Sequence, residues 1–181
     1  MNPPAFRGQG GTLESDPQSP MGSLINISDL LAPEAVLASL KAQSKKQLLQ
    51  ELAARAHART HLPEKQIFET LIERERLGTT GVGSGIAIPH GRMAGATSIT
   101  GVFAKLEVPI AYDAVDGQPV DLVFMLLAPE NAGADHLKAL ARVSRLLRNQ
   151  QTCEKLRAAK SAEALYAILT DQTGGSSSQA A

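Results

Sequence analysis

The hydrophobic pattern of this 181-residue chain changes twice, and the order of the changes constrains the fold. Apolar residues recur with a helical period before residue 78 and again after residue 134. Between these regions lie short β-rich runs at 85–88, 99–106 and 122–127, bounded by Gly, Pro or Asp. Helices, then strands, then helices predict a mixed α/β fold, in which a central mixed β-sheet is flanked by helices in a single domain.

Capping signals place the helices of the first half. A short helix is expected at Pro33, because a proline in the first turn loses no helical hydrogen bond. Ser44 can cap a second helix, and Gln47, three residues on, completes a capping box. Pro63 opens a third helix, which is expected to end at Gly78.

A long helix is expected after the last strand. Its apolar stripe consists of Leu137, Leu140, Val143, Leu146 and Leu147. Thr152 and Ser161 are expected to cap two final helices.

The two ends of the chain lack such patterns. Residues 1–23 are rich in Pro, Gly, Ser and Gln, and residues 172–181 are rich in Gly and Ser, so both are expected to be disordered. Met21 is an alternative start to Met1. The expected domain therefore spans residues 24–171.

Composition narrows the class of protein. The 18 basic and 18 acidic residues balance, which gives no field for nucleic acid or a membrane surface. The longest apolar run, 122–128, is far shorter than the ~20 residues of a membrane span, and the N-terminus lacks a signal-peptide pattern. A cytoplasmic protein is expected, without membrane insertion or a nucleic-acid partner. The lone Cys153 rules out an internal disulfide and a thiolate metal cluster.

The segment 78–91, GTTGVGSGIAIPHG, is the most informative of the chain. A short strand is expected to end just before His90, with Gly91 letting the chain turn away from the imidazole. A ring nitrogen of a neutral imidazole can act as a nucleophile near pH 7. The backbone N–H groups around Gly81, Gly83 and Gly85 are expected to lie near it and to be able to bind phosphate oxygens. A structural role for His90 stays open on these residues alone.

The glycine pattern does not fit a nucleotide site. Its spacing is not that of G-x-G-x-x-G, and no Gly-Lys-Ser/Thr follows as in a P-loop. No nucleotide cofactor is therefore expected.

The run from Arg74 to Arg92 closely resembles the active-site signature of the IIA components of the bacterial phosphotransferase system, in the mannitol/fructose/nitrogen class. The segments 116–124 (DGQPVDLVF) and 134–140 (ADHLKAL) are similar to the same family. The opening at 27–34 (ISDLLAPE) looks like the nitrogen-regulatory branch. The resemblance covers residues 24–170.

The resemblance implies roles for three residues. His90 matches the phosphorylated histidine, which the family phosphorylates at Nε2; His136 matches a supporting histidine near it, and Arg74 matches an arginine that reaches the phosphoryl group. An arginine offers a rigid set of donors to the charged oxygens of a transferring phosphoryl group. The resemblance also implies a histidine phosphocarrier protein as donor, with no cofactor and no metal.

Plainer readings of these side chains remain open. Arg74 lies in a run of charges, which is typical of a solvated helix face. His136 is expected near a helix start, where a structural or solvated role is common. His57 and His61 have a spacing that can bind a metal, but Ala58 replaces the glutamate of an H-E-x-x-H motif and no third ligand is evident. A solvated helix end is expected for this pair.

Several functions fit the resemblance. The first is a phosphohistidine carrier that regulates target proteins according to its phosphorylation state. The alternative is a sugar-specific fructose/mannitol IIA component that passes phosphate to a IIB partner; no IIB motif is fused to this chain. A pure binding module is disfavoured because His90, Arg74 and His136 are all present, and a hydrolase is disfavoured because no nucleophile with an orienting acid can be placed beside His90.

Overall fold

The computed structural model describes residues 25–171. The elements follow in the order α1 (Ile27–Leu30), a 3-10 helix η1 (Pro33–Ala35), β1 (Val36–Leu40), α2 (Lys45–Thr60), α3 (Glu64–Leu77), β2 (Gly81–Gly83), β3 (Ile86–Ala87), β4 (His90–Met93), β5 (Thr100–Ile110), β6 (Val120–Pro129), α4 (Ala134–Arg148), α5 (Gln150–Ala158) and α6 (Ala162–Thr170). The expected disordered segments 1–23 and 172–181, and the choice between Met1 and Met21, lie outside the described residues.

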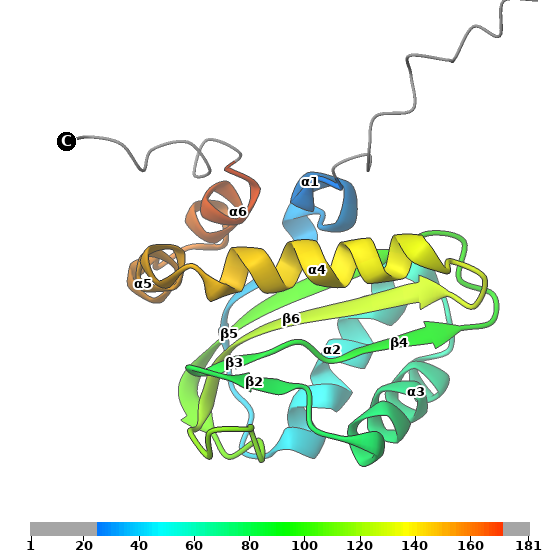
Figure 1. Cartoon of the computed structure of the whole chain (residues 1–181), viewed down its shortest axis with the longest axis horizontal. Helices are drawn as coiled ribbons and strands as arrows, with labels where there is room; N and C mark the ends of the chain where they lie inside the picture. The colour runs from blue at the N-terminus through cyan, green and yellow to red at the C-terminus, as the bar shows by residue number, and fades with distance from the viewer. Residues whose placement is uncertain (1–24, 172–181) are drawn as a thin grey trace, which may run out of the picture.

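A six-stranded sheet forms the centre of the fold, with the order β1-β5-β6-β3-β2 and with β4 also paired to β6. Strands β5 and β6 are antiparallel, whereas β1 pairs parallel with β5, and both β3 and β4 pair parallel with β6. In Figure 1, α4 crosses the front of the sheet and α2 lies behind it. The predicted fold class, a single-domain mixed α/β fold with a mixed sheet flanked by helices, is confirmed.

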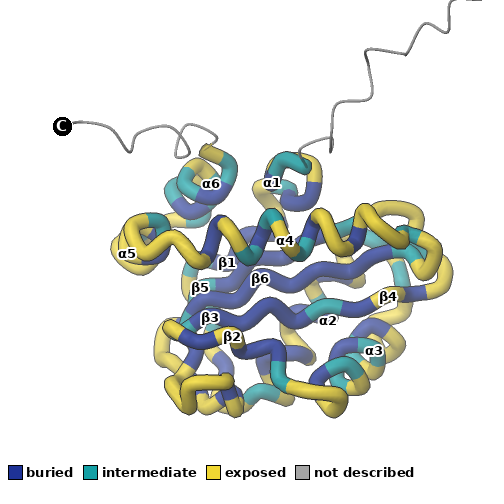
Figure 2. Tube along the Cα trace, in the orientation of Figure 1, coloured by how far each residue is buried: buried dark blue, intermediate teal, exposed yellow. Residues whose placement is uncertain are grey.

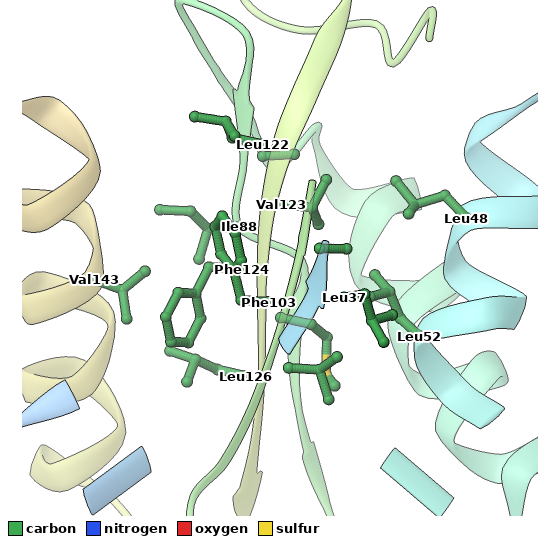
Figure 3. Close-up of a cluster of buried hydrophobic side chains, with 14 of the residues drawn as sticks. Leu37, Leu48, Leu52, Ile88, Phe103, Leu122, Val123, Phe124, Leu126 and Val143 are labelled. Atoms are coloured by element: carbon green, nitrogen blue, oxygen red, sulfur yellow. The ribbon is translucent and has the colours of Figure 1, made fainter. Parts of the chain in front are cut away.

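Strand β6 is the most deeply buried element. Every residue from 122 to 128 is buried, since helices cover both faces of the sheet at this strand. Figure 3 shows the sheet edge-on, with Val143 of α4 on one side and Leu48 and Leu52 of α2 on the other. This rigid central strand is the scaffold beside which β4 lies.

The helix caps agree with the sequence at most positions. Ser44 accepts a hydrogen bond from the backbone N–H of Gln47 at 3.1 Å, and Ser161 caps α6. The prediction for Thr152 was wrong, because Asn149 caps α5 and Thr152 donates its N–H to the Asn149 side chain at 3.1 Å. None of the helices within residues 25–171 has the length and hydrophobicity needed to span a bilayer.

The sequence did not predict α1 or β1. The helix expected at Pro33 is only the three-residue η1, and the chain then enters β1. Val36 and Leu37 of β1 pair with Phe103 and Ala104 of β5. A partner about 67 positions away in the chain therefore decides the conformation of this segment, and local periodicity does not contain that information.

Candidate functional site

His90 is the first residue of β4, opposite Leu126 of β6. The sequence predicted that a strand ends just before His90; in fact β3 ends at Ala87 and sheet pairing resumes at His90. Gly91 does not turn the chain away from the imidazole, as was expected. It continues β4 and lies against α3, where a Cβ atom would be 2.5 Å from Thr70 Cγ2. Gly91 therefore allows close approach of α3 to the strand that carries His90.

The His90 ring is half-buried and held by its own backbone. Its Nδ1 lies 2.8 Å from the carbonyl oxygen of Ile88. Since a carbonyl only accepts, Nδ1 carries the proton and Nε2 keeps its lone pair. Burial lowers the pKa of His90 from 6.5; the Ile88 hydrogen bond opposes this, and the positive charge of Arg74 adds to it. His90 is thus a neutral imidazole at neutral pH, with Nε2 as the available nucleophile.

Arg74 reaches this nitrogen from the last turn of α3. Its Nε lies 3.3 Å from Nε2 of His90, and its Nη1 donates to the carbonyl oxygen of Gly78 at 2.9 Å. The side chain is thus held across the end of the helix. The reading of Arg74 as part of a solvated helix face does not describe this position.

His136, in the first turn of α4, stands on the other side of His90. Its side chain is buried, and the two ring centroids are 5.6 Å apart with an interplanar angle of 81°. Arg92 points its Nε at His136 Nδ1 at 3.3 Å. Because a guanidinium only donates, this contact leaves the proton of the neutral ring on Nε2. Burial, followed by His90 and Arg92, lowers the pKa of His136 from 6.5.

Sequence reasoning assigned no role to Arg92. A signal was available, because residues two apart on a strand point to the same face, and His90 and Arg92 have that spacing. The signal was missed because 90–93 was not predicted to be a strand.

These side chains line one open groove of about 540 Å³. Its lining residues are Thr70, Glu73, Arg74, Leu77, His90, Gly91, Arg92, His136, Leu137 and Leu140. Leu77 and Leu137 are 85% and 64% exposed, which is unusual for leucine and leaves an apolar rim around the polar centre. The groove therefore combines a nucleophilic nitrogen with two guanidinium groups.

The glycines before His90 lie elsewhere, contrary to expectation. Gly83 and Ser84 line a separate cavity of about 500 Å³, between the β2–β3 turn and the helices α4 and α5. The N–H of Ser84 donates to Asp116 at 2.9 Å, and that of Gly81 to Thr79 at 3.0 Å. Antiparallel pairing of β2 with β3 puts their turn at the end of β3 away from His90. These N–H groups are not phosphate ligands at His90.

The other histidines form no metal site. His57 and His61 are exposed at the end of α2, and His57 Nδ1 lies 2.7 Å from the carbonyl oxygen of Leu62. Within residues 25–171 no group of three or more His, Cys, Asp or Glu side chains is arranged to hold a metal ion.

Residues 29–172 match the family model described as "Phosphoenolpyruvate-dependent sugar phosphotransferase system, EIIA 2". The chain therefore belongs to the EIIA type-2 family of the phosphotransferase system.

Within this family, the chain is similar to nitrogen regulatory proteins. It is 59% identical to the one from Bradyrhizobium diazoefficiens over 143 residues, covering 79% of this chain and 94% of the relative. It is 43% identical to the one from Escherichia coli K12 over 151 residues, covering 83% and 93%. The crystal structure of nitrogen regulatory protein IIA-Ntr from Neisseria meningitidis superposes with a TM-score of 0.76 at 40% identity, covering 80% of this chain and 99% of that one. The expected resemblance to the nitrogen-regulatory branch is confirmed.

Proposed function

We propose that this protein is a phosphohistidine carrier of the nitrogen-type phosphotransferase system, which accepts phosphate on His90 from a histidine phosphocarrier protein. The observation that carries the proposal is the lone pair of His90 Nε2, left free by the Nδ1 contact to Ile88 and faced by Arg74 at 3.3 Å. Family membership supports phosphotransfer as the chemistry.

The transfer step balances without a proton or a cofactor. Nε2 of His90 attacks phosphorus of the donor's phosphohistidine, and a new N–P bond forms as the donor's N–P bond breaks. The electron pair of the broken bond returns to the donor imidazole, which leaves as a neutral ring. The proton on Nδ1 of His90 stays in its hydrogen bond to Ile88 throughout.

The neighbouring groups stabilise the charge of the transferring phosphoryl group. Arg74 exchanges its contact with Nε2 for one with phosphoryl oxygens when the new bond forms. His136, with its proton on Nε2, serves as a neutral donor close to the same oxygens, and Arg92 holds it in that form. Fixed donors of this kind contribute most where charge develops in the transition state.

Regulation of target proteins is the proposed role of the phosphorylated state. The similarity to nitrogen regulatory proteins favours it over a sugar-specific fructose/mannitol function with transfer to a IIB partner, which the family description alone also fits. A dianionic group in the groove would change which partners can cover its apolar rim, since an unpaired buried charge is costly. The cytoplasmic location and the domain limits 24–171 stay predictions.

Incubation with a phosphorylated histidine phosphocarrier protein tests the chemistry. The protein should gain one acid-labile, base-stable phosphoryl group, and the His90→Ala variant should gain none. Uptake of acid-labile phosphate by that variant would show that another residue is the acceptor.

Recovery of partners from a cell extract tests the regulatory role. The phosphorylated protein and the His90→Ala variant should recover different sets of proteins. Identical sets, together with a growth defect of a deletion strain on a single sugar, would favour the sugar-specific alternative.

A further inference from the structure

A buried ion pair lies directly behind Arg74. Its neighbour Glu75 is only 9% exposed, although it belongs to a run of charged residues on α3. The Glu75 carboxylate lies 2.6 Å from Lys45 Nζ and accepts hydrogen bonds from the Tyr112 hydroxyl at 2.9 Å and from both the N–H and the hydroxyl of Thr80. All four groups that satisfy this carboxylate come from outside α3.

Both members of this pair stand at the helix end that disfavours their charge. Lys45 is the first residue of α2, where the helix dipole disfavours a cation, and Glu75 is in the last turn of α3, where it disfavours an anion. Burying such a pair also costs desolvation, so an apolar pair of similar volume is often as stable. An arrangement that breaks local rules in this way is typical of a functional site.

Tyr112 connects the pair to the segment that follows β5. Lys45 Nζ lies 4.4 Å from the centroid of the Tyr112 ring and 3.2 Å from its carbonyl oxygen. The Tyr112 hydroxyl also contacts Thr80 Oγ1 at 3.0 Å. Burial raises the pKa of Tyr112, so it remains a hydroxyl that can donate to Glu75. The end of α3 is therefore tied to α2, to the start of β2 and to the segment after β5.

This attachment determines where Arg74 can reach. Successive residues on a helix point about 100° apart, so Glu75 can grip the protein interior while Arg74 extends into the groove. Arg74 adds only two contacts of its own, to Gly78 and to His90. The geometry points to Glu75, Lys45 and Tyr112 as a positioning cluster that holds the last turn of α3 so that Arg74 faces His90. This inference rests on the proposed function, in which Arg74 assists phosphoryl transfer.

A double-mutant cycle on the transfer rate distinguishes positioning from a purely structural role. Rates are measured with a phosphorylated phosphocarrier protein for wild type, Glu75→Gln, Arg74→Ala and the double variant. Since small displacements of catalytic groups cost up to about a hundredfold, Glu75→Gln should slow transfer roughly tenfold or more. In the Arg74→Ala background the same change should alter the rate by less than about twofold, because the group it positions is gone.

An equal loss from Glu75→Gln in both backgrounds would overturn the inference, and so would a wild-type rate in Arg74→Ala. Neither result bears on whether His90 is the acceptor, which the His90→Ala variant tests separately. Asp121→Asn is the control, because it breaks the Arg157–Asp121 ion pair of 2.9 Å at the separate cavity. It should leave the transfer rate unchanged.

Tyr112→Phe gives a second measurement that keeps every charge in place. Arg74 lowers the pKa of His90, so withdrawal of Arg74 from the ring should raise that pKa toward 6.5. The pKa is read from an NMR titration of the His90 ring. A lower melting temperature with an unchanged His90 pKa would mean that the cluster is structural only, and would overturn the inference.

Discussion

Replacing Gly91 with alanine should push α3 away from the strand that carries His90. The added Cβ would lie 2.5 Å from Thr70 Cγ2, and β4 cannot retreat because Gly91 pairs with Leu127 of β6. Thr70 is held as well, since its hydroxyl donates to the carbonyl oxygen of Gln66 at 2.8 Å. The helix itself therefore has to move.

The size of the effect follows from two opposing terms. Overpacking costs about 1–3 kcal/mol, whereas the loss of glycine's freedom in the unfolded chain stabilises by ~0.4–1 kcal/mol. Overpacking wins, with a net loss of about 1–2 kcal/mol. For a domain of this size the melting temperature should fall by about 2–8 °C. Because Arg74 lies on the displaced helix, phosphorylation of His90 should slow as well.

Thermal unfolding and transfer rates for four proteins test this reasoning. Thr70→Ser removes Cγ2 but keeps a hydroxyl for the bond to Gln66, so Gly91→Ala should be better tolerated in that background, by about 1 kcal/mol. The Thr70→Ser variant alone is the matched control. If Gly91→Ala melts with the wild type, or destabilises both backgrounds equally, contact with Thr70 is not what requires glycine here.

Two further predictions concern the electrostatics of the groove. Arg92→Gln should raise the pKa of His136 toward 6.5 in an NMR titration, and both Arg92→Gln and His136→Ala should slow phosphorylation, by up to about a hundredfold for His136; wild-type rates in both would remove these residues from the site. The lowered pKa of His90 keeps Nε2 unprotonated below pH 6.5, so the phosphorylation rate should fall only as the pH drops through that lowered pKa. In Arg74→Ala the fall should begin at higher pH, since a cation that lowers the pKa is lost; an unchanged profile would contradict this electrostatic role.

Local sequence patterns predicted the long elements because their signals are local. Strand β6 is a continuous apolar run, and α4 has a clear apolar stripe, so neither depends on knowing its neighbours. Strands β1 and β4 exist through pairing with β5 and β6. The sequence of β4, His-Gly-Arg-Met, has no strand propensity to reveal it.

The same distinction applies to the site. His90, Arg74 and His136 were named through the resemblance to a family, and the fold brings all three to one groove. The burial of Glu75 could not be foreseen, because its charge partner Lys45 is 30 positions earlier in the chain and their contact requires α2 and α3 to pack side by side. The glycines at 81–85 were misplaced because nearness in sequence was taken for nearness in space, although β3 separates them from His90.

NMR of the ¹⁵N-labelled, phosphorylated protein tests the central claim most directly, because it identifies both the residue and the ring nitrogen that carry the phosphoryl group. The hydrogen bond from His90 Nδ1 to Ile88 predicts that phosphorus is bonded to Nε2 of His90, with Nδ1 still protonated. Phosphorus on Nδ1 of His90, or on His136, would contradict the account.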